Sequence, residues 1–411
     1  MNGWVYNFLR KTQKYTGTDN IYLAEGGFWL TLNQFIGAGT SFLAALAFAN
    51  LLNPAIYGTY QYILSLIGML GIFSLQGIRT AMAQAVARGL EGSFYSGFKT
   101  RLRWGSIGSL IALGLAIYYW LTGDKTLFFP LLIAVVFLPL MQASRVYSGF
   151  LAGKKLFAVG AKYNIYTDLI STAAIIAALF LTKNVFWLIT AFIVSNTFLN
   201  CFFDYLTKIR FRPNKKEDPE TIKYAKHLSL AGVISLMGDY LDRILLFNLA
   251  GPVQLAVYSF AMIMPEQIKG FMGNISTLAF PKLAQKSKEE IRTNLMKKFW
   301  KLIILTCAII ALYILIAPFF YEIFFPKYLS SLPYSRILVF SLLALPASLL
   351  GTVFEAKMMK KSIYALQMFS LIRIILYLVL IPLFGIWGII MARLSMVILN
   401  SAFILFLFRR L

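Results

Sequence analysis

The sequence predicts an all-α polytopic membrane protein, with about 12 transmembrane helices in two six-helix halves around a central cavity. Three observations lead to this fold class: the composition, the succession of long apolar runs, and the sidedness of the basic residues. Of the 411 residues, 59% are hydrophobic and only 13% are charged, and the mean hydropathy is +0.72. Soluble domains are charged at roughly a quarter of their positions. The composition therefore excludes an ordinary soluble enzyme, a disordered chain and a disulfide scaffold.

Twelve apolar runs reach the roughly 20 residues that a membrane-spanning helix needs. They cover residues 28–49, 57–79, 104–122, 127–149, 163–182, 185–206, 227–248, 253–276, 299–320, 334–355, 363–382 and 385–408. The loops between them are too short for a soluble domain. Residues 1–26 lack the apolar core of a signal peptide. We expect them to form an amphipathic segment on the inner membrane surface, with Trp4, Phe8 and Leu9 towards lipid.

The basic residues gather on one side of these spans. Counting Lys and Arg gives 29 on the side of the termini, including Arg101 in the loop after the second span, and 4 on the opposite side. Because cytoplasmic loops retain basic residues, we expect both termini in the cytoplasm. The same rule explains the net charge of +23 without a nucleic-acid partner.

The chain also contains a sparse internal repeat. A shift of 198 residues places Pro54 on Pro252, and a shift of 200 places Trp187 on Trp387. Parallel halves related about the membrane normal place a cavity at their interface, as in many alternating-access transporters. The repeat predicts two halves joined by a cytoplasmic linker, with the boundaries 27–207, 208–226 and 227–411.

The second predicted span has one mostly polar helical face. The residues that recur there at steps of three or four are Gln61, Ser65, Gly68, Ile72, Gln76 and Arg79. We expect this face to line the cavity. The first two spans of each half, together with the last two spans, are the predicted cavity-lining helices.

Six cations fall inside the predicted spans, namely Arg79, Arg145, Arg243, Lys269, Arg373 and Arg393. Each would cost roughly 2.5–3.5 kcal/mol in lipid, so we expect them to pair or to line a wet cavity. Arg79 and Arg145 lie near the inner ends, where snorkelling to headgroups is an alternative. Arg373 and Arg393 have no acidic residue one helical turn away, which favours binding of an anionic group.

Carboxylates at comparable depth are Asp168, Asp239, Asp242 and Glu266. Asp239 with Arg243, and Glu266 with Lys269, have the helical spacing of structural ion pairs, so the residues alone leave structural and functional roles open. Two separated cysteines and one histidine, His227, argue against a metal site or triad chemistry.

Three stretches resemble motifs of a known family. They are Ala49-Asn-Leu-Leu-Asn-Pro-Ala-Ile-Tyr-Gly-Thr-Tyr-Gln61, Gly238-Asp-Tyr-Leu-Asp-Arg-Ile-Leu-Leu246, and the turn from Gly149 to Lys155. In these motifs the chain is similar to the polysaccharide transporter family. This family comprises Wzx-type lipid-linked oligosaccharide flippases within the multidrug/oligosaccharidyl-lipid/polysaccharide exporter superfamily. The chain departs from the pattern at Asn53, where the family often has glycine.

The resemblance implies that an undecaprenyl-pyrophosphate-linked oligosaccharide (an O-antigen, capsule or exopolysaccharide repeat unit) is flipped across the bacterial cytoplasmic membrane. Alternating access without an enzymatic step is the implied mechanism. Guanidinium groups match phosphate oxygens, so the expected pyrophosphate site consists of Arg373 and Arg393, helped by Arg79, Lys269, Arg145 and Arg243. Antiport of H⁺ or Na⁺ is implied as the driving force, and its expected carriers are Asp239, Asp242 and Glu266. The implied partners are the lipid-linked oligosaccharide, membrane lipids and other polysaccharide-assembly membrane proteins, and no cofactor or metal is expected.

Two other classes of protein remain as alternatives. A multidrug or cation exporter of the same superfamily should have an acidic or apolar cavity, whereas the buried charges here have a positive excess. An integral-membrane glycan polymerase or ligase needs a catalytic outer loop. The longest predicted outer loop, residues 321–333, holds only Glu322 and Lys327 as charges, and no acid–base pair stands out.

Overall fold

The computed structural model describes residues 20–285, 288–356 and 359–410, and every regular element in these ranges is a helix. The first half contains α2 (Asn20–Leu51), α3 (Pro54–Leu70), the 3-10 helix η1 (Gly71–Ser74), α4 (Ile78–Ala87), α5 (Ser93–Leu121), α6 (Lys125–Ser144), α7 (Tyr147–Gly153), α8 (Phe157–Leu181) and α9 (Val185–Phe211). The second half contains α10 (Glu220–Gln285), α11 (Lys288–Phe324), η2 (Pro326–Ser331), α12 (Leu332–Leu338), η3 (Val339–Leu343), α13 (Ala344–Ala356), α14 (Lys360–Phe384) and α15 (Ile386–Arg409). Residues 1–19 of the predicted surface segment lie outside the described residues.

The predicted membrane spans correspond to helices of the structure. In the described part of the chain, 11 helices are long and apolar enough to cross a membrane. The number differs from the prediction because α10 holds two predicted spans, 227–248 and 253–276. Its two arms meet at Gly251, whose φ of 85° is readily adopted only by glycine. The chain is therefore an all-helical, multi-pass membrane protein.

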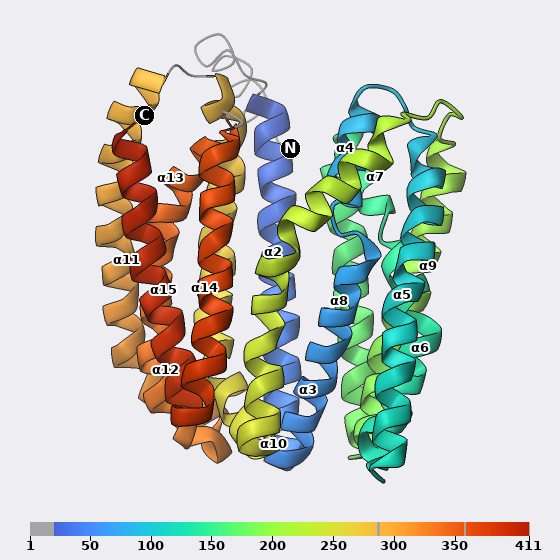
Figure 1. Cartoon of the computed structure of the whole chain (residues 1–411), viewed down its shortest axis with the longest axis vertical. Helices are drawn as coiled ribbons and strands as arrows, with labels where there is room; N and C mark the ends of the chain where they lie inside the picture. Colours follow the sequence, from blue (N-terminus) through green and yellow to red (C-terminus); the bar gives the residue numbers. More distant parts are fainter. Residues whose placement is uncertain (1–19, 286–287, 357–358, 411) are drawn as a thin grey trace.

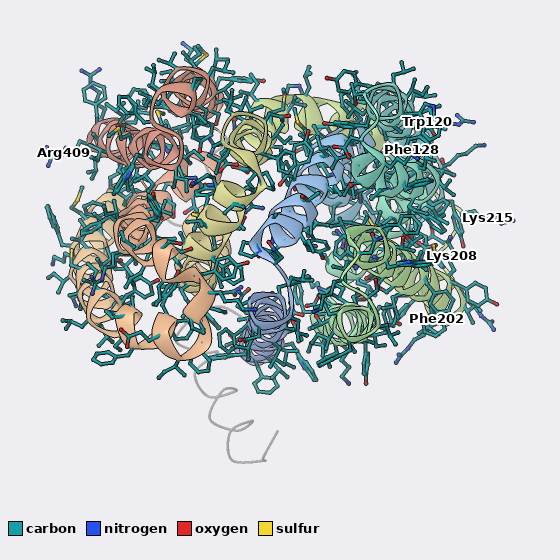
Figure 2. The ribbon with its side chains drawn as sticks, turned by 90° about the horizontal axis from the view of Figure 1, so that it is seen from below. Trp120, Phe128, Phe202, Lys208, Lys215 and Arg409 are labelled. Carbon is teal, nitrogen blue, oxygen red and sulfur yellow. The ribbon has the colours of Figure 1, made fainter. Side chains whose placement is uncertain are left out.

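The helices form two clusters with a central group between them. Figure 1 shows α4 to α9 on one side, α11 to α15 on the other, and α2, α3 and α10 in between. The view along the helices in Figure 2 shows the same division. The start of α2 and the end of α15 lie at the same end of the molecule (Figure 1), as an even number of crossings requires.

Large apolar side chains cover the outside of both clusters. Leu110, Leu181 and Ile304 are 69%, 87% and 69% exposed. Soluble monomers rarely expose contiguous apolar surface on this scale, whereas helices in a bilayer satisfy their backbone internally and present apolar side chains to lipid. The lipid tails complete the burial of this surface.

Two predicted spans are broken inside the protein. The span predicted over 57–79 ends as a regular helix at Leu70, continues as η1, and restarts as α4 after Leu75, whose φ is 54°. The span over 127–149 is interrupted between α6 and α7 at Arg145. Irregular backbone at membrane depth is tolerated where protein buries it or where it borders a wet cavity. These breaks therefore point to the part of the molecule where polar groups gather.

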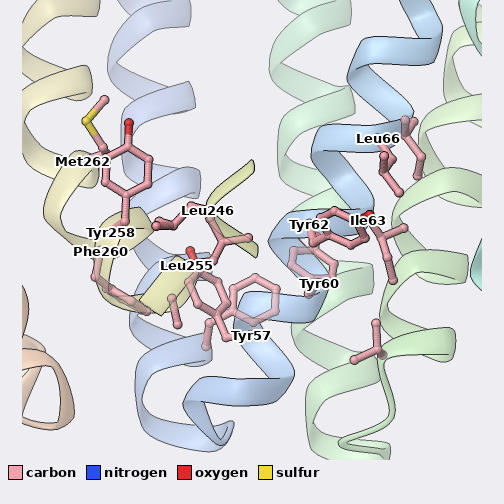
Figure 3. Close-up of a cluster of buried hydrophobic side chains, with 14 of the residues drawn as sticks. Tyr57, Tyr60, Tyr62, Ile63, Leu66, Leu246, Leu255, Tyr258, Phe260 and Met262 are labelled. Carbon is pink, nitrogen blue, oxygen red and sulfur yellow. The ribbon is translucent and has the colours of Figure 1, made fainter. Parts of the chain in front are cut away.

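The two halves pack tightly where α3 meets α10 near Gly251, and we call this the closed end. A Cβ on Gly58 would lie 1.8 Å from the carbonyl oxygen of Pro252, so the two backbones are in contact. The ring of Tyr62 stacks on Phe247 with centroids 3.9 Å apart. Figure 3 shows Tyr57 of α3 beside the α10 side chains in this packing. The apolar core thus crosses the interface between the halves and closes it here.

At the opposite end, the segment between α9 and α10 is docked on the first half. The Gly92 N–H donates to the Lys216 carbonyl at 2.8 Å, and the Asp218 N–H donates to Ser93 Oγ at 3.0 Å. The linker predicted over 208–226 is helical at both ends, and only residues 212–219 lie between the helices. We call this the linker end of the molecule.

Two buried carboxylates hold the linker end in place. Glu91 forms an ion pair with Lys154 and accepts a hydrogen bond from the Asn214 N–H, while Asp218 forms an ion pair with Arg88. Burial raises the pKa of each carboxyl, but the hydrogen bonds and the nearby cations lower it more. Both pKa values therefore lie below their usual range.

Candidate functional site

A cavity of about 580 Å³ lies between the halves, near the breaks in α3 and α6. Its lining includes four arginines: Arg79 on α4, Arg101 on α5, Arg145 between α6 and α7, and Arg243 on α10. No Asp or Glu is among the described residues that line it. We call it the arginine cavity. Arg101 is buried and Arg243 half-buried, whereas Arg79 and Arg145 are exposed. A cavity with four arginines and no carboxylate among its described lining residues is unusual, because charges at membrane depth are normally paired.

The predicted polar face of the second span lines this cavity despite the break in the helix. Five of its six members are lining residues, namely Gln61, Gly68, Ile72, Gln76 and Arg79. Ser65, the sixth, is buried and donates its hydroxyl to the Gln61 carbonyl at 2.8 Å. The prediction that this face borders a cavity is therefore confirmed.

Arg101 is the cavity residue that the sequence analysis misplaced. It was counted among the loop cations, but α5 begins at Ser93 and carries Arg101 into the interior, where it is only 4% exposed. Its guanidinium donates to the amide oxygens of Gln76 at 3.0 Å and Gln142 at 3.2 Å. Its Nε has no partner among the described residues. Two amide oxygens orient the group without neutralising its charge.

A signal for Arg101 was present in the sequence. The buried face of α5 is a stripe of small residues that includes Gly105, Gly108 and Ala112 at steps of three or four, and Gly97 lies two such steps before Gly105. Arg101 lies on this same stripe, so helical periodicity extended towards Ser93 would have placed it inside. The long apolar run starts only at 104, and this displaced the predicted beginning of the helix.

Arg373 and Arg393, the preferred candidates from the sequence, belong to a second group of charges. Arg393 lies 2.7 Å from the Asp242 carboxylate and 3.5 Å from that of Glu266, whereas Arg373 lies 3.0 Å from Asp239. Their partners come from α10, across the helix interface, rather than from one turn along the same helix. Neither arginine is among the described residues that line the arginine cavity.

The remaining predicted pairs have different outcomes. Lys269 lies 3.4 Å from Glu266, as its helical spacing allows. Asp239 does not pair with Arg243 as the helical spacing allowed. It forms an ion pair with Arg373 instead, and Arg243 lines the arginine cavity. The described residues contain no group of His, Cys, Asp and Glu side chains that could hold a metal ion.

Asp242 is the most deeply buried of these carboxylates, with no exposed surface. Besides the ion pair with Arg393, the Asp242 carboxylate accepts hydrogen bonds from the Tyr258 hydroxyl and from the backbone N–H of Arg243, each at 2.7 Å. Through these contacts the Asp242 carboxylate holds α10 against α15. The group is a compact charge network beside the arginine cavity.

A family model described as "Polysaccharide biosynthesis protein" matches residues 23–285, which include all four cavity arginines. The chain belongs to the polysaccharide biosynthesis protein family. No curated protein sequence matches this family member significantly.

Solved structures share the fold of this family member at low sequence identity. The lipid II flippase MurJ in an inward closed conformation aligns with a TM-score of 0.66 at 16% identity, covering 94% of this chain and 87% of that one. A MATE structure aligns with a TM-score of 0.61 at 15% identity, over 93% and 95%. A transporter of the MOP superfamily from Pyrococcus furiosus aligns at 0.59 and 15%, over 94% and 96%. The fold is therefore the two-lobe fold of these transporters.

Proposed function

We propose that the protein is a flippase that moves an undecaprenyl-pyrophosphate-linked oligosaccharide across the bacterial cytoplasmic membrane. The observation that carries this proposal is the arginine cavity, in which four guanidinium groups face one space without a carboxylate among its described lining residues. Membership in a polysaccharide biosynthesis family and the likeness of the fold to a lipid II flippase support the same substrate class.

The cavity has the chemistry that a pyrophosphate requires. A pyrophosphate–sugar head group cannot cross hydrocarbon unaided, because its charges and hydroxyls would lose their hydration. Guanidinium forks donate two parallel hydrogen bonds to phosphate oxygens, and Arg101 and Arg243 each retain an unpartnered Nε among the described residues. The bound anion supplies the negative charge that the cavity lacks, while the isoprenoid tail stays in lipid.

The closed end accounts for one half of an alternating-access cycle. The halves are packed together there, and the arginine cavity lies nearer the linker end, towards the inner loops. In the proposed cycle the substrate enters from the inner leaflet, and the α3–α10 contact then opens to release it outside.

Ion antiport is the proposed source of energy. In this proposal Asp242, Glu266 and Asp239 take up H⁺ or Na⁺, and this releases Arg393 and Arg373 from their ion pairs. Loosening that network would change how α10 packs on α14 and α15, and α10 also contributes Arg243 to the cavity. The coupling ion and the substrate would thereby act on the same helix.

A binding measurement tests the proposal. Purified protein should bind a short-chain polyprenyl pyrophosphate more tightly than the matching monophosphate, and should not bind a cationic dye. Replacing Arg79 or Arg145 by Gln should weaken pyrophosphate binding by roughly tenfold or more, since charged hydrogen bonds contribute about 1.5–3 kcal/mol. Tight dye binding together with unchanged pyrophosphate binding in these variants would support a drug exporter and contradict the proposal.

A further inference from the structure

A second cavity of about 420 Å³ lies between the arginine cavity and the closed end, and we call it the outer chamber. Phe48, Tyr57 and Tyr60, which belong to the packed cluster of the closed end, form part of its wall. Figure 3 shows the two tyrosines in that cluster. Its volume falls within the roughly 300–1,000 Å³ typical of small-molecule sites.

The outer chamber adjoins the arginine cavity. Gln61, Leu64, Phe192 and Arg243 line both spaces. For a ligand whose anionic group binds the arginines, the outer chamber is the neighbouring space on the other side of Gln61 and Arg243. In a lipid-linked oligosaccharide the sugar attached to the pyrophosphate occupies this position in the molecule.

The lining of the outer chamber differs in chemistry from that of the arginine cavity. Its uncharged polar side chains include Ser41, Thr172, Ser259 and Gln267, and aromatic rings line the same space. Hydroxyl and amide groups exchange hydrogen bonds with sugar hydroxyls, and aromatic faces pack against the apolar faces of sugar rings. The only charged lining residues described are Arg243 and Glu266, which have opposite signs. This composition suits a neutral, hydroxyl-rich ligand.

Ser259 provides an independent indication of a ligand. It is 7% exposed, lines the outer chamber, and its Oγ is buried without a hydrogen-bond partner among the described residues. A buried hydroxyl without a partner costs about 1–3 kcal/mol, so such groups are rare unless a ligand or water satisfies them. Ser259 is on the second arm of α10, and Thr172 faces the same space from α8.

We propose that the outer chamber binds the sugar rings next to the pyrophosphate and selects which glycan is transported. The proposal rests on the proposed function, because the arginine cavity supplies the anchor for the pyrophosphate. The aromatic wall packs against the sugar face, and Thr172, Ser259 and Gln267 hydrogen-bond its hydroxyls. Because the same aromatic side chains belong to the closed end, the sugar lies against the surface that must open for release.

Binding of two matched lipids to the full-length protein tests this inference. The probes are a short-chain polyprenyl pyrophosphate and the same lipid carrying one sugar, taken from a panel of a neutral hexose, an N-acetylhexosamine and a hexuronic acid. At least one glycosylated probe should bind more tightly than the bare lipid. The variant Thr172→Val with Ser259→Ala should lose about tenfold of the affinity for that probe and keep its affinity for the bare lipid.

The control is Thr190→Val with Ser195→Ala, which removes the same hydroxyl groups from a groove between α8 and α9 that shares no lining residue with the outer chamber. This variant should bind every probe as the unmodified protein does. Equal binding of bare and glycosylated lipids, or an unchanged preference in the chamber variant, would overturn the inference. If Arg79→Gln and Arg145→Gln left the affinity for the bare lipid unchanged, the proposed function itself would be overturned. Failure of the inference and failure of the proposed function therefore give different results.

Discussion

At the scale of single residues, two kinds of buried arginine coexist in this protein. Arg101 is oriented by two glutamine oxygens, whereas Arg393 is neutralised by Asp242. A cation held by neutral groups keeps its charge available for a ligand. A cation paired with a buried carboxylate contributes to the packing of helices. The two kinds predict opposite results when they are replaced.

Replacing Arg101 by Gln should impair binding more than folding. The change removes an uncompensated buried charge, whose desolvation is costly, so the melting temperature should stay the same or rise. Affinity for polyprenyl pyrophosphate should fall about tenfold, as measured by calorimetric titration of purified protein. A large fall in melting temperature with unchanged affinity would show that Arg101 is structural.

Replacing Arg393 by Leu should impair folding first. It leaves the fully buried Asp242 carboxylate without its cation, which costs about 3–5 kcal/mol of stability. Thermal unfolding of the purified protein should show this loss, and adding Asp242→Asn should recover part of it. Normal stability combined with lost pyrophosphate binding would restore the prediction that Arg393 holds the substrate.

The difference between these arginines limits what the sequence could predict about the site. Arg79, Arg145 and Arg243 were predicted to fall within apolar spans and to pair or line a wet cavity, and the structure places them in the lining of one cavity. The partners of Arg373 and Arg393 lie more than a hundred positions away in the chain, on α10. Helical spacing detects neighbours only within one helix, so such pairs could not be predicted without the packing of the helices.

At the scale of elements, the linker end is fastened by carboxylates with lowered pKa values. A carboxyl whose pKa is lower in the folded state than in the unfolded state stabilises the folded protein fully at a pH above its unfolded pKa of about 4. This contribution to stability is lost as the pH falls through the pKa of the folded state. The ion pairs of Glu91 and Asp218 are therefore complete at neutral pH and lost in acid.

The double variant Glu91→Gln with Asp218→Asn tests this fastening. Its melting temperature should be lower than that of the unmodified protein at pH 7. The difference should shrink as the pH falls below the usual carboxyl range, because the unmodified protein then loses the same charges. Melting curves across this pH range give the comparison. If the difference in melting temperature were the same at every pH, the charges of the two carboxylates would not contribute to docking of the linker.

The contact between α3 and α10 at the closed end depends on Gly58. A methyl group there would meet the Pro252 carbonyl at 1.8 Å, so Gly58→Ala should force the halves apart at this end. The test uses protein in which Cys201 and Cys307 are replaced and Leu64→Cys is introduced. With Gly58→Ala added, the thiol at position 64 should become accessible to an impermeant thiol reagent from outside. The matched change Gly114→Ala, where a Cβ would meet nothing within 4 Å, should leave labelling unchanged. Equal labelling of both variants would contradict the assignment of the closed end.

The elements themselves were largely predictable from apolar run length. The spans and their order follow from hydropathy because a bilayer imposes a minimum helix length. The breaks after Leu70 and at Arg145 were not predicted, since they occur within runs that are apolar enough to continue. Their position is set by the polar groups of the cavity, which only the assembled fold brings together.

At the scale of the whole molecule, the charges explain why two halves are needed. Three cavity arginines come from the first half, and Arg243 comes from α10 of the second. An anion bound between them contacts both halves at once, so its binding can be linked to their relative movement. This linkage is the central claim of the proposed mechanism.

Transport in liposomes tests that claim most directly. Vesicles containing the purified protein and a labelled polyprenyl-pyrophosphate oligosaccharide would be followed as the label becomes accessible on the opposite face. We predict rapid movement with the unmodified protein and with Lys183→Gln, Lys223→Gln and Lys361→Gln combined, which replaces three exposed cations. The combination of Arg79→Gln, Arg145→Gln and Arg243→Gln should reduce movement to the rate of protein-free vesicles. Movement at the full rate in this last variant would contradict the account.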